Sequence, residues 1–160
     1  MGRSIYQHLG KLPSMIDLDN QTGLNFSLEA LEIIASSLCS REVELLIVDD
    51  STIEALNLQH REKASATDVL SFPVDLPPNL ESSSAFPLGS IVVASSFVVE
   101  KASYFRHSVQ DELSLLFIHG MLHLLGYDHE VDNGEMRQKE ATLIEAFALP
   151  NSLIIRTEEK

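Results

Sequence analysis

The sequence is poor in cysteine and contains no long uninterrupted run of apolar residues. Cys39 is the only cysteine among its 160 residues, which excludes an internal disulfide and a structural zinc site built from several cysteines. No stretch approaches the roughly 18 apolar residues that a membrane-spanning helix requires. The first residues also lack the basic, apolar and small-residue zones of a secretory signal. These absences predict a protein of the reducing cytoplasm that has no membrane segment.

Basic residues are also scarce. The chain has 24 Asp and Glu against 11 Lys and Arg, which gives it a formal net charge of −13. Such a charge repels phosphate groups and argues against generic, charge-driven binding of nucleic acid. A nucleic-acid function would therefore need a local basic patch, or recruitment through a basic protein partner.

Length and composition fit one globular domain, because 44% of the residues are hydrophobic and can form a core. A second plausible start, Met15, opens a strand-like segment. We therefore expect residues 1–14 to be an N-terminal extension or a remnant of cloning, and residues 15–160 to form the domain.

The spacing of apolar residues predicts an α/β fold with about four strands and about five helices. Short apolar or β-branched runs predict strands at residues 15–18, 43–48, 69–72 and 88–94. The helices are expected to end near residues 38, 58, 102, 125 and 147. The residues expected to begin these five helices are, in order, Ser27, Asp49 or Asp50, Ser95 or Ser96, Ser108, and Asn133.

Three of the six histidines fall close together at the end of the longest predicted helix. His119 and His123 are four residues apart, so they project from one face of a helix and can chelate one ion. Gly126 can adopt a positive φ, end the helix and turn the chain back, which would bring His129 to the same ion. Three imidazoles suit zinc and leave a fourth coordination position for water. The sequence therefore predicts a metal site at His119, His123 and His129.

The plainer alternative is that these are unrelated histidines, two of them packed in a core helix. The hypothesis of a metal site is favoured, because buried imidazoles that bind no metal would each need another polar partner. One Zn²⁺ ion is the expected occupant, although imidazole also suits nickel, copper and iron.

A comparison with metalloproteases limits the reactions that we expect the predicted metal site to catalyse. The metzincin signature H-E-x-x-H-x-x-G-x-x-H has the same histidine and glycine offsets, and its glutamate is the general base. Here Gly120 stands at the position of that glutamate. The ligands match and the base is missing, which disfavours peptide hydrolysis by that mechanism.

Other polar residues have weaker claims to a role. Arg61 offers a planar, permanently charged fork for phosphate, but taken alone it reads more readily as a surface arginine beside Glu62. Asp68 could brace the site or belong to a turn. Asp128 could orient an imidazole or merely close the loop.

The chain resembles the YbeY family of bacterial metal-dependent endoribonucleases, also called rRNA maturation factors. The family signature H-G-x-L-H-L-x-G-Y-D-H is met in full by residues 119–129, and a second block appears as Arg61 with residues 67–73. The resemblance extends over roughly residues 15–147. Two departures are the replacement of a usual aspartate by Ser90, to which we therefore assign no catalytic role, and His60 where a tyrosine is common.

The resemblance implies a small, mostly parallel sheet, a zinc ion on the three matching histidines and a functional arginine at Arg61. It implies single-strand RNA cleavage in small-subunit rRNA maturation and ribosome quality control. Two alternatives remain open: a zinc metallohydrolase of another substrate class such as peptide, and a non-catalytic zinc-containing ribosome-assembly factor. The net charge further suggests that the ribosomal small subunit, or a basic ribosomal protein, recruits the enzyme to its RNA.

Overall fold

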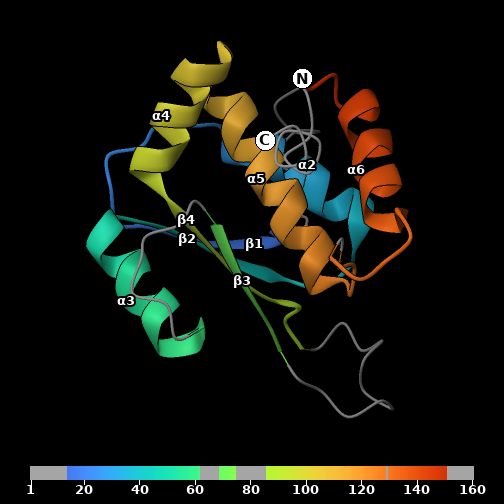
Figure 1. The fold of residues 1–160 in the computed structure, drawn as a ribbon, viewed down its shortest axis with the longest axis horizontal. Coiled ribbons are helices and arrows are strands. Elements are labelled where there is room, and N and C mark those ends of the chain that lie inside the picture. The colour runs from blue at the N-terminus through green and yellow to red at the C-terminus, as the bar shows by residue number, and fades with distance from the viewer. Residues whose placement is uncertain (1–13, 62–68, 75–85, 129, 151–160) are drawn as a thin grey trace, which may run out of the picture.

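A computed structural model describes residues 14–61, 69–74, 86–128 and 130–150, and Figure 1 shows their arrangement. Within these residues it has four strands and five helices, which confirms the predicted α/β fold. The elements are β1 (Ile16–Asn20), α2 (Leu28–Leu38), β2 (Val43–Val48), α3 (Asp50–Arg61), β3 (Val69–Pro73), β4 (Gly89–Ala94), α4 (Ser95–Phe105), α5 (Val109–Leu124) and α6 (Glu135–Ala146).

The four strands form one sheet in the order β1-β2-β4-β3. The β1–β2 and β2–β4 pairs are parallel, and β3 pairs antiparallel with β4 at one edge. The sheet is therefore mostly parallel, as the family resemblance implied. Parallel strands need crossover connections, and the helices that follow the strands supply them here.

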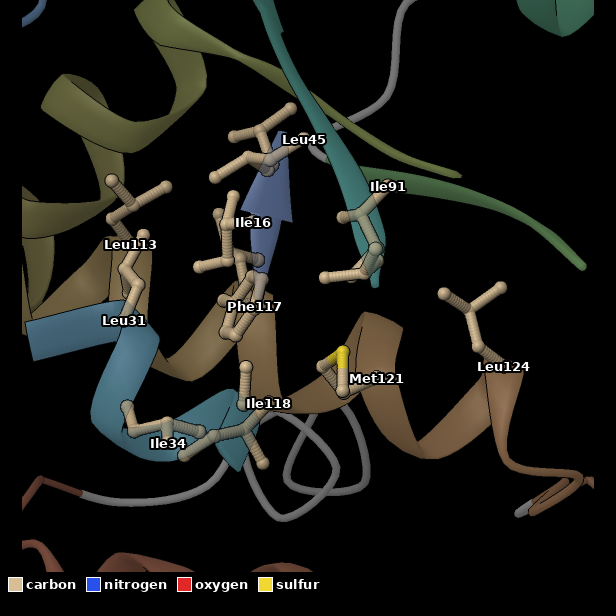
Figure 2. Close-up of a cluster of buried hydrophobic side chains, with 14 of the residues drawn as sticks. Ile16, Leu31, Ile34, Leu45, Ile91, Leu113, Phe117, Ile118, Met121 and Leu124 are labelled. Carbon is tan, nitrogen blue, oxygen red and sulfur yellow. The ribbon is translucent and has the colours of Figure 1, made fainter. Parts of the chain in front are cut away.

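Helices cover both faces of the sheet. α2, α4, α5 and α6 lie on one face, and α3 lies on the other (Figure 1). The larger core lies between the sheet and α5, where Phe117 and Met121 pack against side chains such as Ile16, Leu45 and Ile91 (Figure 2). A smaller core around Ile53, Leu70 and Val92 lies beneath α3. Burial on both faces explains why the inner strands read as continuous apolar runs.

Local chemistry sets most of the helix starts. Ser27 and Ser108 accept hydrogen bonds from backbone N–H groups in the first turns of α2 and α5, as predicted. Of the two candidates at α3, Asp49 is the cap, because its carboxylate accepts from the Thr52 N–H at 2.9 Å. Hydrogen bonds from the Thr52 side chain and backbone, and from Ser51, hold the pKa of Asp49 below its ordinary value.

The start of α6 differs from the prediction. Gly134, not Asn133, occupies the N-cap position. The capping carboxylate belongs to Asp132, which accepts from the N–H of Gly134 at 2.8 Å and from that of Met136 at 3.0 Å. An aspartate two residues before the cap thus supplies the acceptor that a cap side chain normally provides. No helix within the described residues is long and apolar enough to cross a membrane.

Candidate metal centre

Helix α5 carries the site and is the most deeply buried helix of the described part of the chain. Residues 112–122 and Leu124 are all buried, whereas His123 is partly exposed. Two glycines let α5 approach the sheet closely. A Cβ on Gly120 would lie 3.0 Å from the Ile91 side chain, and one on Gly89 would lie 2.8 Å from Leu124. The helix therefore sits tightly on β4, and its histidines are held in a fixed place.

His119 and His123 meet as the four-residue spacing predicted. Their Nε2 atoms are 3.1 Å apart, and the rings are nearly perpendicular, at 79°. Two nitrogens that bind one zinc tetrahedrally, at about 2.0–2.1 Å each, are about 3.3 Å apart. The observed separation is close to that value. The pair of nitrogens thus fits two ligands of a tetrahedral ion without rearrangement of the backbone.

The third predicted ligand, His129, lies outside the described residues. The chain up to it behaves as expected. Gly126 has a φ of 101°, and its N–H bonds to the His123 carbonyl at 3.0 Å. This left-handed residue ends the helix and turns the chain, as a C′ glycine does. Within the described residues no three His, Cys, Asp or Glu side chains are grouped to hold an ion, and the role of His129 remains a prediction.

Asp128 had two predicted roles, and its observed contacts fit loop closure. Its carboxylate accepts from the Glu130 N–H at 3.0 Å, and its carbonyl accepts from the N–H groups of Val131 and Asp132. The side chain is exposed. These are the local bonds of a turn.

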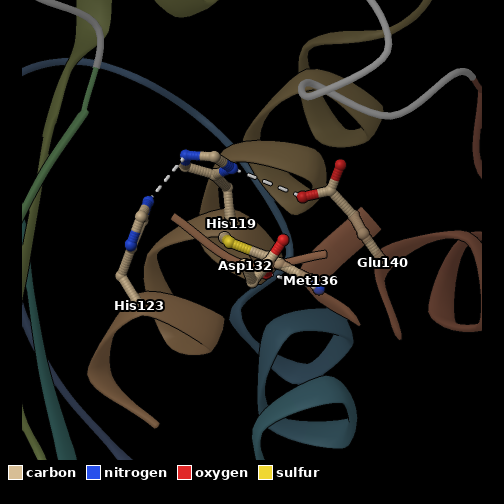
Figure 3. Close-up of polar contacts among 5 residues, drawn as sticks. All are labelled: His119, His123, Asp132, Met136 and Glu140. Atoms are coloured by element: carbon tan, nitrogen blue, oxygen red, sulfur yellow. Dashed lines mark hydrogen bonds and ion pairs between the residues drawn. The ribbon is translucent and has the colours of Figure 1, made fainter. Parts of the chain in front are cut away.

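A carboxylate that the sequence reasoning missed does reach His119. Glu140 of α6 places Oε2 3.3 Å from Nδ1 of His119 (Figure 3). Glu140 is only 1% exposed. One sequence signal could have found it, because Glu140 lies four residues after Met136 and three before Leu143, on the apolar face of α6. A glutamate at such a position needs a polar partner.

The missing protease base has a structural explanation. Gly120 is buried, and a side chain there would point at Ile91 of the sheet and not toward the histidine pair. Successive residues on a helix differ by about 100° in direction, so this position faces the core once His119 faces α6. The fold therefore has no room for a catalytic glutamate at residue 120.

The remaining predicted residues are not brought to the histidines by what the structure describes. The backbone of Arg61 ends α3, on the sheet face opposite α5 (Figure 1). Its side chain and residues 62–68, including Thr67 and Asp68, lie outside the described part. Ser90 is engaged elsewhere, since its hydroxyl donates to Oε1 of Glu44 at 2.7 Å on the neighbouring strand.

The chain is similar to proteins that are named as endoribonucleases. The family model described as "Endoribonuclease YbeY" matches residues 14–148. A protein of that name from a Sulfurovum species is 57% identical over 145 residues, covering 91% of this chain and 99% of the relative. One from Helicobacter pylori is 50% identical over 146 residues, with coverage of 91% and 99%.

A solved structure supports the same architecture. The solution structure of a Thermotoga maritima protein is 30% identical in sequence and superimposes with a TM-score of 0.55. The match covers 83% of this chain and 89% of that protein.

Proposed function

Because the chain belongs to the YbeY family of endoribonucleases, we propose that it cleaves single-stranded RNA at a metal centre formed by His119, His123 and His129. The observation that carries the proposal is the 3.1 Å separation of the first two Nε2 atoms on a helix fixed in the core. The proposed cofactor is one Zn²⁺ ion, for which a three-histidine set with an open position is suited. We place this activity in small-subunit rRNA maturation and ribosome quality control, in the cytoplasm.

The proposed mechanism divides the work between the ion and the chain. When bound, a zinc ion supplies Lewis acidity toward a phosphate oxygen and activates water near neutral pH. His119 and His123 present their Nε2 atoms toward one point, so the chain fixes where that chemistry takes place. Arg61 is proposed to bind the scissile phosphate and stabilise its developing negative charge through its guanidinium fork. Residues 1–14 are proposed to extend the chain outside the catalytic domain of residues 15–160.

The two alternatives considered from the sequence are not favoured. The Sulfurovum and Helicobacter relatives are both named as endoribonucleases, not as peptidases or assembly factors. Peptide hydrolysis by the metzincin route would also need a glutamate where Gly120 packs against Ile91.

The experiment that tests the proposal measures cleavage of a single-stranded RNA, its duplex form and a set of peptides by zinc-loaded protein. We expect cleavage of the single strand, little of the duplex and none of the peptides. Chelation of the zinc should stop cleavage, and re-addition should restore it. Peptide hydrolysis without RNA cleavage would overturn the proposal.

Arg61→Ala should keep the metal and the fold but lower cleavage by about 100-fold or more, the usual cost of removing one group that stabilises transition-state charge. Arg61→Lys should recover only part of the rate, because an ammonium group lacks the planar fork. Arg137→Ala, on the exposed face of α6, is the matched control and should cleave normally. Normal cleavage by a folded Arg61→Ala protein would show that this assignment is wrong.

The net charge of −13 gives a further expectation about substrate delivery. Naked RNA should bind weakly and with a shallow salt dependence, because few basic groups neutralise phosphates. Purified small ribosomal subunits should bind more tightly, since a basic ribosomal protein can contact the acidic surface. Filter or fluorescence binding at several salt concentrations measures both affinities. Equal affinity for subunits and free rRNA would contradict recruitment through a protein.

A further inference from the structure

Two glutamates among the described residues, Glu112 and Glu140, are buried and have no task in the proposed mechanism, and Glu140 is the one that contacts a predicted metal ligand. Its side chain is 1% exposed and lies on the face of α6 that also carries Met136 and Leu143, both members of the main core. A carboxylate in such surroundings costs stability unless it is paired and hydrogen-bonded. Its placement therefore calls for a reason connected with the residues that it touches.

Glu140 contacts the predicted ligand His119 at Nδ1, the ring nitrogen that is not expected to bind the metal. Its Oε2 lies 3.3 Å from Nδ1 of His119, while Nε2 of the same ring lies 3.1 Å from Nε2 of His123. Figure 3 shows the His119 ring between the two partners, with His123 on one side and Glu140 on the other. An ionised carboxylate can only accept a hydrogen bond, so with Glu140 ionised a neutral His119 carries its ring proton on Nδ1 and keeps the Nε2 lone pair for a metal.

We infer that Glu140 is a positioning residue, which fixes the tautomer and orientation of His119 so that its Nε2 is ready to bind the metal. This inference rests on the proposed metal centre. Carboxylate–histidine–metal arrangements of this kind orient the ring and raise the basicity of the ligand nitrogen. The negative charge of Glu140 also compensates part of the positive charge that an ion brings into a buried site.

The geometry separates this role from that of a fourth metal ligand. Glu140 approaches Nδ1 of His119, whereas an ion held by the proposed ligands would be bound by Nε2, which faces His123 (Figure 3). The observed carboxylate therefore does not close the coordination position that catalysis needs. A structural zinc with four protein ligands would require a different donor.

Helix α6 holds the carboxylate in place. Asp132 fixes the first turn of α6 through its bonds to the N–H groups of Gly134 and Met136. The buried side chains of Met136 and Leu143 then hold the helix against the core one turn on either side of Glu140. The carboxylate thus approaches His119 from a packed helix and not from a loop, which suits a positioning group.

The test measures metal affinity directly, without RNA. Zinc affinity is obtained by competition with a chromophoric chelator for wild type, Glu140→Gln, Glu140→Ala and the control Glu145→Gln, which alters an exposed glutamate of the same helix. We expect Glu140→Ala to bind zinc about 10–100-fold more weakly. Glu140→Gln should weaken binding less, because its amide oxygen still accepts the Nδ1–H bond but carries no charge. The control should match wild type.

The outcomes distinguish positioning from a structural role. The apo forms of Glu140→Gln and Glu145→Gln should unfold at similar temperatures. If Glu140 were purely structural, its replacement would instead lower the stability of the apo protein and leave the metal affinity of the folded protein unchanged. If Glu140→Ala does not fold, Glu140→Gln decides. Wild-type zinc affinity in the folded variant overturns the inference. A wild-type protein that binds zinc at the histidines but leaves RNA intact would instead overturn the proposed function alone.

Discussion

Replacing His123 by alanine should abolish stoichiometric zinc binding and reduce RNA cleavage to background. The two Nε2 atoms at 3.1 Å form the rigid part of the predicted site. Loss of a residue that only orients a ligand typically costs 10–100-fold in metal affinity, so loss of a ligand itself should cost more than about 100-fold. His123 is only partly buried, and its removal should leave the fold largely intact.

Metal content of the purified variant, determined by elemental mass spectrometry, and cleavage of single-stranded RNA measure the two effects together. His8→Ala is the control, because it removes a histidine that has no ligand spacing and should alter neither. The thermal midpoint of the apo proteins tests whether the fold is retained. A folded His123→Ala protein that still holds one zinc ion and cleaves RNA would refute the three-histidine site.

Replacing Gly120 by glutamate should unfold the protein and should not create a peptidase. The new Cβ would lie 3.0 Å from Ile91, and overpacking of this kind costs about 1–3 kcal/mol. The carboxylate would also be buried without a partner, which adds several kcal/mol. Together these costs are comparable with the roughly 5–15 kcal/mol that stabilise a typical domain.

Gly120→Ala separates the two contributions. It adds the steric clash without the charge, and a gain in helix propensity of up to about 1 kcal/mol offsets part of the clash. Gln138→Glu, at an exposed position of α6, introduces the same carboxylate on a helix surface and should leave stability nearly unchanged. Circular dichroism melts and a peptide cleavage assay make the comparison. A folded Gly120→Glu protein with peptidase activity would contradict this expectation and would support a protease-like site at the histidines.

The same histidine spacing can serve different reactions, because the residues around the ligands depend on how the helix is packed. The ligands need only the four-residue repeat and the glycine turn, which are local features of one helix. The direction in which the residue after the first histidine points, toward the metal or into the core, depends on how the helix packs. Here α5 turns the position after His119 into the sheet and turns His119 itself toward Glu140 of α6. The site therefore has a carboxylate, Glu140, at Nδ1 of its ligand His119, and none at residue 120, where the metzincin signature has its glutamate.

The sequence by itself determined what is encoded within a few residues. The caps at Ser27 and Ser108, the turn at Gly126 and the approach of His119 to His123 follow from local hydrogen bonding and helix periodicity, and the structure confirms them. The α/β class also followed, because apolar periodicity reports which faces are buried. At α6 the local reading was wrong, since Asn133 and Asp132 are both suitable acceptors and only the path of the loop selects between them.

Only the tertiary structure decided what depends on contacts between distant segments. Glu140 reaches His119 from 21 positions along the chain, and Gly120 is required by Ile91 of β4. No periodicity within a single helix specifies which partner its faces will meet, because that choice is made when α5, α6 and the sheet pack together. The histidine pair was thus readable from the sequence, whereas the carboxylate behind it and the reason for the missing base came from packing.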